Sequence, residues 1–207
     1  MASVSESIDH VKFAPAVEGV LPVFLQRWSA RAFSEQPVSD TDLKKVFEAA
    51  RWSPSAYNEQ PWRFIVGVKG TETHARLAKA LIGFNQAWAP KAPVLILGAA
   101  KAQFTHNGAA NGYALYDLGA ASAALVTQAA ALGLTAHQMA GFDHDAARKA
   151  LGIPEDYVLG AITALGYPGE AGVLGDEKLI AMENAPRSRK ALDEIVQTAW
   201  GESAKLG

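Results

Sequence analysis

The sequence predicts one α+β domain, and three observations lead to this class. The chain has 207 residues, of which 49% are hydrophobic and 19% charged, a balance that supports one sizeable core, although two small domains are possible. Short apolar runs typical of buried strands mix with amphipathic helical patterns. These elements do not alternate in a regular strand–helix–strand order, so we do not expect a parallel α/β sheet.

The first clear helix is predicted over residues 38–52, in VSDTDLKKVFEAARW. Ser39 or Asp40 can cap its start. It should end near Ser53, because Pro54 disfavours helical geometry in the residue before it. Its apolar face has the spacing i, i+3, i+4, i+7 and consists of Leu43, Val46, Phe47 and Ala50.

Residues 63–68 and 93–99 are nearly continuous apolar runs, which predict central strands covered on both faces. A helix is expected between them over residues 73–83. Its inward face would be formed by Leu77, Ala80 and Leu81. Another strand is predicted over residues 157–167, in YVLGAITALGY.

A long helix of mostly small residues is predicted over residues 109–132, ended by Gly133. Roughly 24 residues at about 1.5 Å each would span about 36 Å. Its apolar character extends nearly all round, so we expect burial on most sides, part of it by a second subunit. A short helix in residues 144–154 should be capped by Asp143 and ended by Gly152, and residues 191–200 should close the chain as an amphipathic helix.

Composition excludes several classes of function. The net charge of −2 argues against general nucleic-acid binding, and the lack of cysteine excludes disulfides, thiolate nucleophiles and iron–sulfur clusters. The five histidines lack metal-ligand spacing, so we expect no metal site. No GxSxG, P-loop or GxGxxG motif occurs, so a bound cofactor should supply any reactivity. The sequence shows no signal peptide or membrane span, and we expect a cytoplasmic protein.

Two short basic clusters stand near opposite ends of the chain. Arginine side chains bind phosphate oxygens in pairs, and serine hydroxyls can complete such a shell. The alternative is that these residues are solvated surface charges. One cluster holds Arg27, Ser29 and Arg31, and the other holds Arg187, Ser188 and Arg189.

The segment RWSARAF, residues 27–33, is followed by PSAYNEQPW, residues 54–62, and this pair resembles the FMN-dependent nitroreductase family. The resemblance continues through GFNQAWAPKAPVLIL, DLGAASAALVTQAAALGLTAHQMAGFD, ALGYPGE and APRSRKALDEIV. It implies a nitroreductase-like domain over residues 21–207, after an N-terminal extension of residues 1–20 whose role is open. It also implies a central mixed or antiparallel sheet flanked by helices, a homodimer with the long helix at its interface, and FMN bound in clefts between subunits.

The resemblance assigns roles to the basic clusters. Arg27 and Ser29 resemble phosphate contacts, joined by Arg187 and Arg189. Arg31 matches a cation near the pyrimidine edge of the flavin, where it would stabilise the charge of the reduced ring. Asn85 can bond the same edge, and Trp88 stands where some relatives have lysine. The full set of expected cofactor-binding residues is Arg27, Trp28, Ser29, Arg31, Ser55, Ala56, Asn58, Asn85, Gln138, Met139, Ala140, Gly141, Arg187 and Arg189.

Within PSAYNEQPW, Ser55, Ala56 and Asn58 correspond to positions near the ribityl chain and ring system. Gln60, Pro61 and Trp62 are interpreted as a hydrogen-bonded turn that anchors the next strand. Residues 137–141 resemble the segment behind the flavin ring, with the N–H groups of Ala140 and Gly141 near N5. Some relatives have a glutamate where Ala140 stands. Met139 in this segment suits either packing in the core or packing against the flavin. His137 suits a structural role.

The resemblance implies that NAD(P)H reduces bound FMN and leaves, and that FMN then passes two electrons to an electron-poor acceptor, such as a nitroaromatic or a quinone. This is a ping-pong mechanism. No side chain is assigned as catalytic, because the flavin carries the chemistry. Phe104 and His106, the distinctive side chains of residues 99–113, are expected to contact substrate. Two alternatives remain: a specialised branch, such as a dehalogenase or an oxidase of an organic substrate, and a flavin-binding module without turnover. The physiological acceptor and the choice between NADH and NADPH are not encoded in a visible motif.

Overall fold

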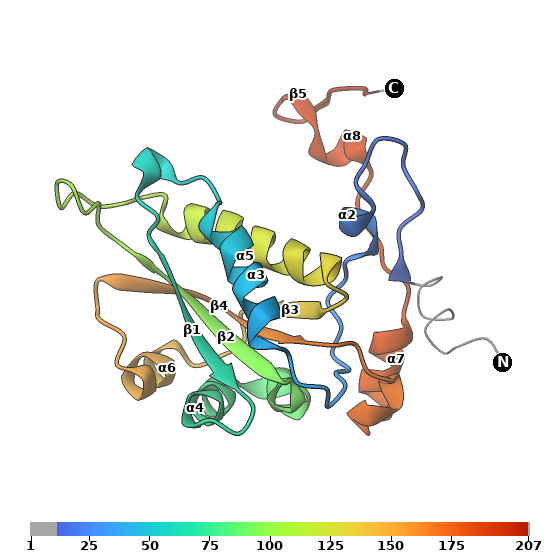
Figure 1. Ribbon diagram of the computed structural model, residues 1–207. Coiled ribbons are helices and arrows are strands. Elements are labelled where there is room, and N and C mark those ends of the chain that lie inside the picture. Colours follow the sequence, from blue (N-terminus) through green and yellow to red (C-terminus); the bar gives the residue numbers. More distant parts are fainter. Residues whose placement is uncertain (1–11, 207) are drawn as a thin grey trace.

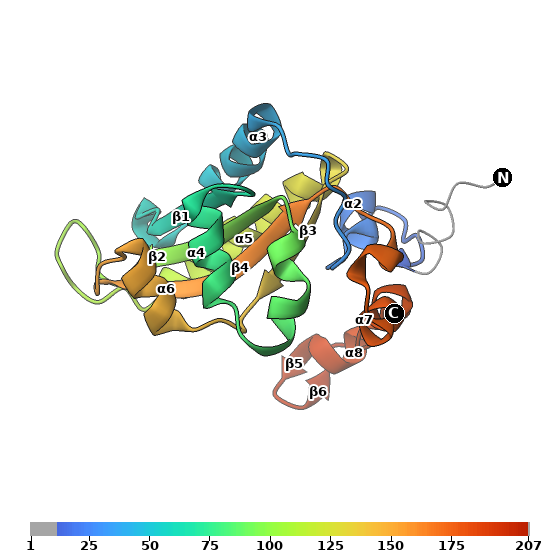
Figure 2. The ribbon, with the colours of Figure 1, turned by 90° about the horizontal axis from the view of Figure 1, so that it is seen from below.

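The computed structural model describes residues 12–206, so most of the predicted N-terminal extension lies outside the described residues. Its centre is a four-stranded antiparallel sheet in the order β1-β2-β4-β3. The strands are β1 Trp62–Val68, β2 Val94–Lys101, β3 Thr135–Met139 and β4 Tyr157–Gly166. Helices α3 and α5 cover one face, and α4 and α6 cover the other, each over its own apolar core (Figures 1 and 2). The predicted α+β class is confirmed.

Local capping explains where several helices begin and end. Helix α3, Asp40–Arg51, starts after Ser39, whose side chain accepts the N–H of Asp42. Helix α4 spans Glu72–Ala80, and α6 spans His144–Leu151. Asp143 caps α6, and Gly152 ends it with a φ of 65°, a conformation that favours glycine. These helices agree with the predicted positions.

Helix α5, Ala114–Ala131, is shorter than the predicted helix over residues 109–132. The preceding residues fold back as a tight loop, because the N–H of Phe104 donates to the carbonyl oxygen of Ala109 and Gly108 takes a φ of 72°. The expected burial on most sides is not met within one chain. Only one face packs on the sheet and α3, whereas Leu115 and Tyr116 are exposed.

Two differences concern the sheet. Strand β1 lies at an edge, not at the centre as predicted, because it pairs only with β2 among the strands of residues 12–206. Strand β2 is central, and its residues from Val94 to Ala100 are all buried. Strand β3 was not predicted, since polar His137 and Gln138 interrupt its apolar pattern.

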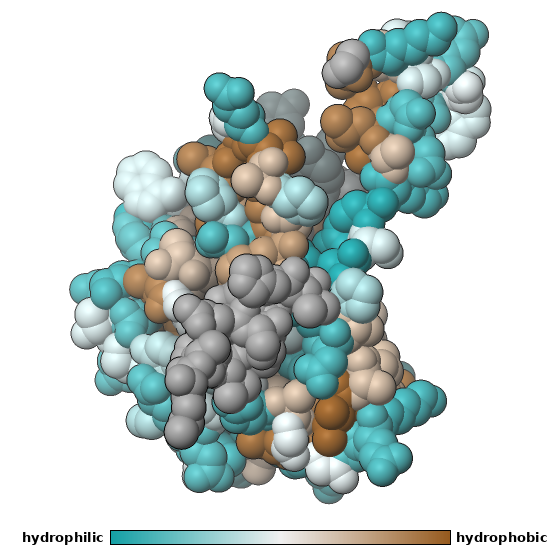
Figure 3. All heavy atoms as spheres, turned by 90° about the vertical axis from the view of Figure 1, so that its right-hand side faces the viewer, coloured by the Kyte–Doolittle hydropathy of each residue, from teal (hydrophilic) through white to brown (hydrophobic). Residues whose placement is uncertain are grey.

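The predicted closing helix over residues 191–200 is wrong. Only α8, Leu192–Ile195, is helical, and a hairpin of β5, Gln197–Ala199, and β6, Glu202–Ser203, follows it. This arm stands away from the body and exposes apolar side chains (Figure 3). An amphipathic helix gains most of its stability from packing, and within residues 12–206 this arm makes few contacts with the body of the molecule.

Further short elements complete the described chain. Helices α2, Pro22–Gln26, and α7, Glu177–Asn184, lie together at the end of the molecule that holds the C-terminus of α5 (Figures 1 and 2). Single 3-10 turns are η1 Ala56–Asn58, η2 Gly83–Ala87, η3 Ala89–Lys91 and η4 Ala171–Leu174. None of the helices between residues 12 and 206 has the length and apolarity needed to span a bilayer.

Candidate functional site

Cationic side chains from both ends of the chain meet beside α2 and α7. The guanidinium of Arg187 donates hydrogen bonds to the carbonyl oxygens of Leu25 and Arg27. Burial lowers the pKa of Arg187, and the charges of Arg189 and Arg27 lower it further. The pKa of Arg27 is lowered by burial and then by the charge of Arg189. The positive charges of Arg27, Arg187 and Arg189 thus act on one another in one region of the molecule, and such a region suits an anion.

Arg31 is held by a buried carboxylate of α7. Its backbone N–H donates to the two oxygens of Glu183 at 2.9 and 3.0 Å, and the N–H of Ala32 donates at 2.9 Å. The guanidinium Nη1 of Arg31 lies 3.9 Å from Glu183 Oε2. The same guanidinium lies 5.8 Å from the ring centre of Phe84 and 5.9 Å from that of Trp88. Arg31 is therefore paired with a carboxylate and lies near two aromatic rings.

Donors remain free in this cationic region. The Nε atoms of Arg31 and Arg187 are buried and have no hydrogen-bond partner among residues 12–206. Buried polar atoms in folded proteins nearly always have a partner. Both atoms are covered by the chain itself, so a ligand with oxygen acceptors would bond them only after the two side chains shift.

Strand β3 and the residues that follow it border the same region. Burial, followed by the charge of Arg31, lowers the pKa of His137 to about 4, and His137 Nδ1 lies 3.1 Å from the carbonyl oxygen of Ala30. His137 is thus neutral and holds the backbone, which agrees with the predicted structural role. Asn85 Nδ2 donates to the carbonyl oxygen of Gly141 at 3.1 Å. Within the described part of the chain, the N–H groups of Ala140 and Gly141 make no hydrogen bond, so they are free donors.

For the remaining residues that the sequence singled out near the flavin, the structure shows burial or exposure but no contact specific to a cofactor. Met139 is buried in the core, as the first of its two interpretations expected, and Trp88 is fully buried between Phe33 and His137. Gln138 and Ser29 are exposed.

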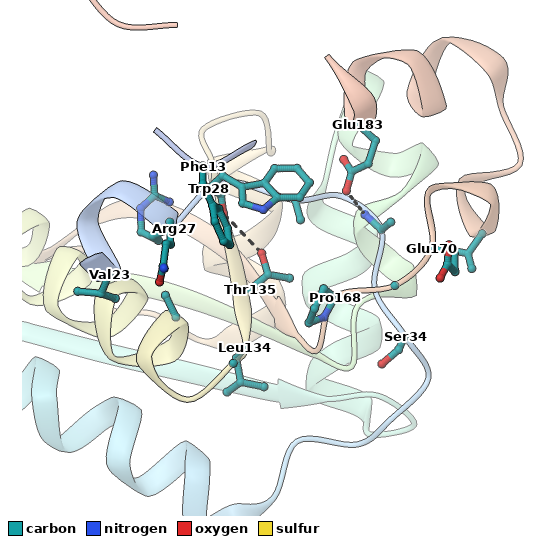
Figure 4. Close-up of a pocket in the computed structure, with 17 residues that line it drawn as sticks. Phe13, Val23, Arg27, Trp28, Ser34, Leu134, Thr135, Pro168, Glu170 and Glu183 are labelled. Carbon is teal, nitrogen blue, oxygen red and sulfur yellow. Dashed lines mark hydrogen bonds between the residues drawn. The ribbon is translucent and has the colours of Figure 1, made fainter. Parts of the chain in front are cut away.

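A cavity of about 570 Å³ lies beside the cationic cluster (Figure 4). Of the predicted cofactor residues, Arg27 and Trp28 line it. Lys12 Nζ lies 4.5 Å above the ring of Trp28, whose carbonyl oxygen accepts the hydroxyl of Thr135 at 3.5 Å. Phe13 and Leu134 add apolar wall. The cavity therefore has apolar walls, and the charged side chains of Arg27 and Glu183 also line it.

The turn formed by residues 54–62 is strained and tightly bonded. Tyr57, Asn58 and Gln60 have φ values of 52°, 54° and 50°, a region that most side chains avoid. Ser55 Oγ accepts the N–H of Gln60 at 3.0 Å, and the N–H of Ala56 donates to Asp117 at 3.1 Å. The hydrogen bond of Gln60 agrees with its interpretation as a turn residue. Pro61 and Trp62 are buried, and Trp62 is the first residue of β1.

Asp117 was missed by sequence reasoning. It is 3% exposed, lies in the first turn of α5 and holds the 54–62 turn through Ala56. One signal could have found it: Asp117 is the only charged residue in α5, a helix in which small and apolar residues predominate. A buried carboxylate needs hydrogen-bond donors, so it marks a contact with another segment.

Three aromatic side chains gather on the outer side of this turn. The ring of Tyr57 lies 5.6 Å from Phe104 and 5.8 Å from His106, and the rings of Phe104 and His106 lie 5.4 Å apart. Glu59 Oε1 accepts the N–H of Thr105 at 2.9 Å, and Glu59 Oε2 lies 3.8 Å from His106 Nδ1. An open hollow of about 560 Å³ is lined by Tyr57 and His106, together with Asn58, Glu59 and Thr105, but not by Phe104. The structure thus brings the two predicted substrate residues together.

The predicted site residues therefore form two groups. The turn group, around Ser55–Asn58, contacts the first turn of α5 through Asp117, and the cationic group, around Arg27–Arg31, meets residues just after α5 through Thr135. Helix α5 has 18 residues, so about 27 Å separates its ends. Figures 1 and 2 show the two groups at opposite ends of this helix.

Within residues 12–206, no group of three or more histidine, aspartate or glutamate side chains is arranged to hold a metal ion.

Comparison with known proteins gives consistent matches. The model of the nitroreductase family matches residues 24–87 and 83–167. A protein of Thermus thermophilus named "NADH dehydrogenase" is 30% identical over 197 residues, covering 75% of this chain and 93% of that protein. A solved structure described as an oxidoreductase containing FMN is 32% identical with a TM-score of 0.82, covering 88% of this chain and 93% of the other. A nitroreductase family protein of Clostridium novyi NT is 25% identical with a TM-score of 0.63, covering 88% and 94%.

Proposed function

Because the chain belongs to the nitroreductase family, we propose that it is an FMN-dependent oxidoreductase that passes electrons from NAD(P)H to electron-poor small molecules. Two observations carry this proposal: Arg187 donates to the backbone of Leu25 and Arg27 in a region that Arg189 also charges positively, and the N–H groups of Ala140 and Gly141 have no partner among residues 12–206. The cationic region suits the phosphate of FMN, and the N–H groups suit the ring.

The chemistry of the free donors fits this cofactor. FMN carries a terminal phosphate, and the unpartnered Nε atom of Arg187 lies within the arginine cluster that would receive it. Arg31 would face the pyrimidine edge of the ring, with Asn85 beside it. A dinucleotide would need a pyrophosphate turn rich in glycine, and the sequence has no such motif. The donor set therefore favours FMN over FAD.

Bound FMN would supply two-electron transfer, which the side chains of this protein cannot perform. The residues of the chain bind and orient the cofactor. Arg27 and Arg187 would retain the phosphate, while Arg31 would stabilise negative charge on the ring. His137 is neutral and bonded to backbone, so it would hold the strand edge and not transfer protons.

The separation of the two residue groups supports a homodimeric site. One FMN molecule cannot span the length of α5 and contact both groups of one chain. A second copy, packed against the exposed face of α5, would bring its turn group to the cationic group of the first. That exposed face includes Tyr116, Gly119 and Ala123, spaced three and four residues apart. Its small residues would let two helices approach closely.

The proposal is tested by cofactor identity and turnover. Flavin released from the purified protein by heat should be FMN by chromatography, and the yellow protein should bleach when NADH or NADPH is added under nitrogen. A quinone should then restore the colour. FAD in the extract would contradict the proposed cofactor, and failure of both nucleotides to bleach the protein would contradict the proposed activity.

A further inference from the structure

Lys12 is the first residue that the structure describes, and it is almost completely buried. It is 4% exposed, although lysine is rarely buried unless its charge is paired. It belongs to the predicted extension of residues 1–20, whose role the sequence leaves open. The proposed flavin contacts do not include it, so its burial has another cause.

The ammonium group of Lys12 joins two segments that are far apart in the sequence. Lys12 Nζ donates a hydrogen bond to the carbonyl oxygen of Ala185, the residue that caps the end of α7. It also lies 4.5 Å from the centre of the Trp28 ring, a distance at which a cation is attracted to the face of the ring. Ala185 stands two residues before Arg187, and Trp28 directly follows Arg27. Lys12 therefore ties together the segments that carry the two basic clusters.

Backbone contacts bring the same three segments together. The N–H of Ala14 donates to the carbonyl oxygen of Leu25 at 3.0 Å, and Arg187 donates to that same oxygen. The start of the described chain accordingly lies beside the segment that leaves α7 (Figures 1 and 2). We call this contact of residues 12–14, 25–28 and 185–187 the terminal clasp.

The terminal clasp holds positive charges together against their own repulsion. Burial lowers the pKa of Lys12, and the charge of Glu183 opposes this effect. The charges of Arg31 and Arg187 lower the pKa of Lys12 further, and the charge of Arg189 acts on Arg187 in the same direction. Like charges in one region push their chain segments apart. The hydrogen bonds that Lys12 and Arg187 donate to backbone carbonyl oxygens oppose this separation.

We propose that Lys12 is a positioning residue for the phosphate of FMN: it holds residues 185–189 against residues 25–28, so that arginines from both ends of the chain are in place before the cofactor binds. Lys12 does not contact the phosphate itself, because its ammonium group is engaged by Ala185 and Trp28. Groups that are ordered before binding lose less conformational entropy when the ligand arrives. This inference rests on the proposed function, since it concerns the phosphate of the same cofactor.

Fluorescence titration of the apoprotein with FMN and with riboflavin, which lacks the phosphate, tests the proposal. Lys12→Met keeps the length of the side chain and removes its charge. It should weaken FMN binding by about 2- to 12-fold, the range of one hydrogen bond, and leave riboflavin binding unchanged. Lys12→Arg can still donate to a carbonyl oxygen and stack on a ring, so it should restore most of the FMN affinity. Lys45→Met, at an exposed position of α3, is the control and should change neither value.

A combined variant separates positioning from a direct contact. In a protein that already carries Arg187→Met and Arg189→Met, residues 185–189 hold no cation for the phosphate, so the addition of Lys12→Met should cause no further loss of FMN affinity. A further loss as large as in the wild-type background would show that Lys12 acts by its own charge, and this would refute the positioning role. Unchanged FMN binding in Lys12→Met, or an equal loss of riboflavin binding, would refute it too.

A measurement without flavin distinguishes failure of the terminal clasp from failure of the proposed function. In urea unfolding of the apoprotein at a fixed concentration, Lys12→Met and Trp28→Leu each remove one partner of the same contact. Together they should destabilise the fold by less than the sum of their separate effects. Additive effects would refute the clasp. A wild-type protein that binds FMN no more tightly than riboflavin would instead refute the proposed phosphate site, whatever the unfolding result.

Discussion

Glu183 and Arg31 are 152 positions apart in the chain, yet the backbone N–H of Arg31 donates to both carboxylate oxygens of Glu183. The N–H of Ala32 donates to the same group. A single buried carboxylate of α7 therefore fixes the path of the residues that lead into the cationic group.

Glu183→Gln should destabilise the fold by about 1–3 kcal/mol, because the amide offers one acceptor oxygen where two are used. Urea unfolding followed by circular dichroism measures this change. Glu177→Gln, on the exposed first turn of the same helix, is the matched control and should cost far less. Equal effects of the two substitutions would show that the buried bonds contribute little.

The pairing of Arg31 with Glu183 also predicts opposite effects on the cofactor. Arg31→Ala should lower the midpoint potential of the bound flavin by about 20–60 mV, which corresponds to about 1–3 kcal/mol for two electrons. Glu183→Gln should raise the potential, since it removes a negative charge that offsets Arg31. Redox titration against a reference dye measures both. An unchanged potential with weaker FMN binding in Arg31→Ala would place Arg31 at the phosphate instead.

Arg27→Ala should weaken FMN binding by about 10- to 100-fold, the usual worth of a hydrogen bond to a charged group. Riboflavin lacks the phosphate, so its dissociation constant should stay nearly constant. Fluorescence titration of the apoprotein with each flavin gives both values. Arg76→Ala removes a surface ion pair on α4 and serves as the control. A parallel loss of riboflavin binding would mean that Arg27 supports the ring side or the fold.

His137 predicts how stability depends on pH. Burial lowers its pKa from 6.5 to about 4, so the unfolded chain takes up a proton at this side chain before the folded one does. Its contribution to stability is therefore present above pH 6.5 and is lost as the pH falls toward 4, by up to about 1.4 kcal/mol per pH unit. His137→Gln should lose less stability between pH 7.5 and pH 5 than the wild type does, by urea unfolding. His144→Gln, at an exposed position of α6, should follow the wild type.

Ala123→Glu should convert the proposed dimer to a monomer of about 22 kDa by light scattering, because it places a charge on the exposed face of α5. The same change at Ala146, exposed on α6 at the opposite face of the sheet, should leave the assembly intact. A wild-type protein of 22 kDa at micromolar concentration would contradict the dimer itself.

The sequence was most informative where structure is decided locally. Ser39 and Asp143 cap their helices as predicted, because a capping side chain acts within three residues. Strand β3 and the 191–200 arm depend on surfaces supplied by distant segments, which no local pattern records. In β3, pairing with β4 stabilises a polar segment that would not be extended alone.

In the candidate site, too, the residues set by local motifs could be predicted, and those that depend on distant segments could not. Its arginines stand in short motifs and could be named before the fold was known. Glu183 could not, since a glutamate in an amphipathic helix has the same pattern whether it faces water or two backbone N–H groups. Asp117 left only the weak signal of a charge within an alanine-rich helix.

In the proposed dimer, the 18 residues of α5 that separate the turn group from the cationic group would make assembly and cofactor loading one coupled equilibrium. If each flavin needs residues from two protomers, then FMN binds the dimer and not the free chain, and by mass action it must strengthen association. Dilution of the protein should therefore release flavin, and excess flavin should hold the protomers together at concentrations where the apoprotein falls apart.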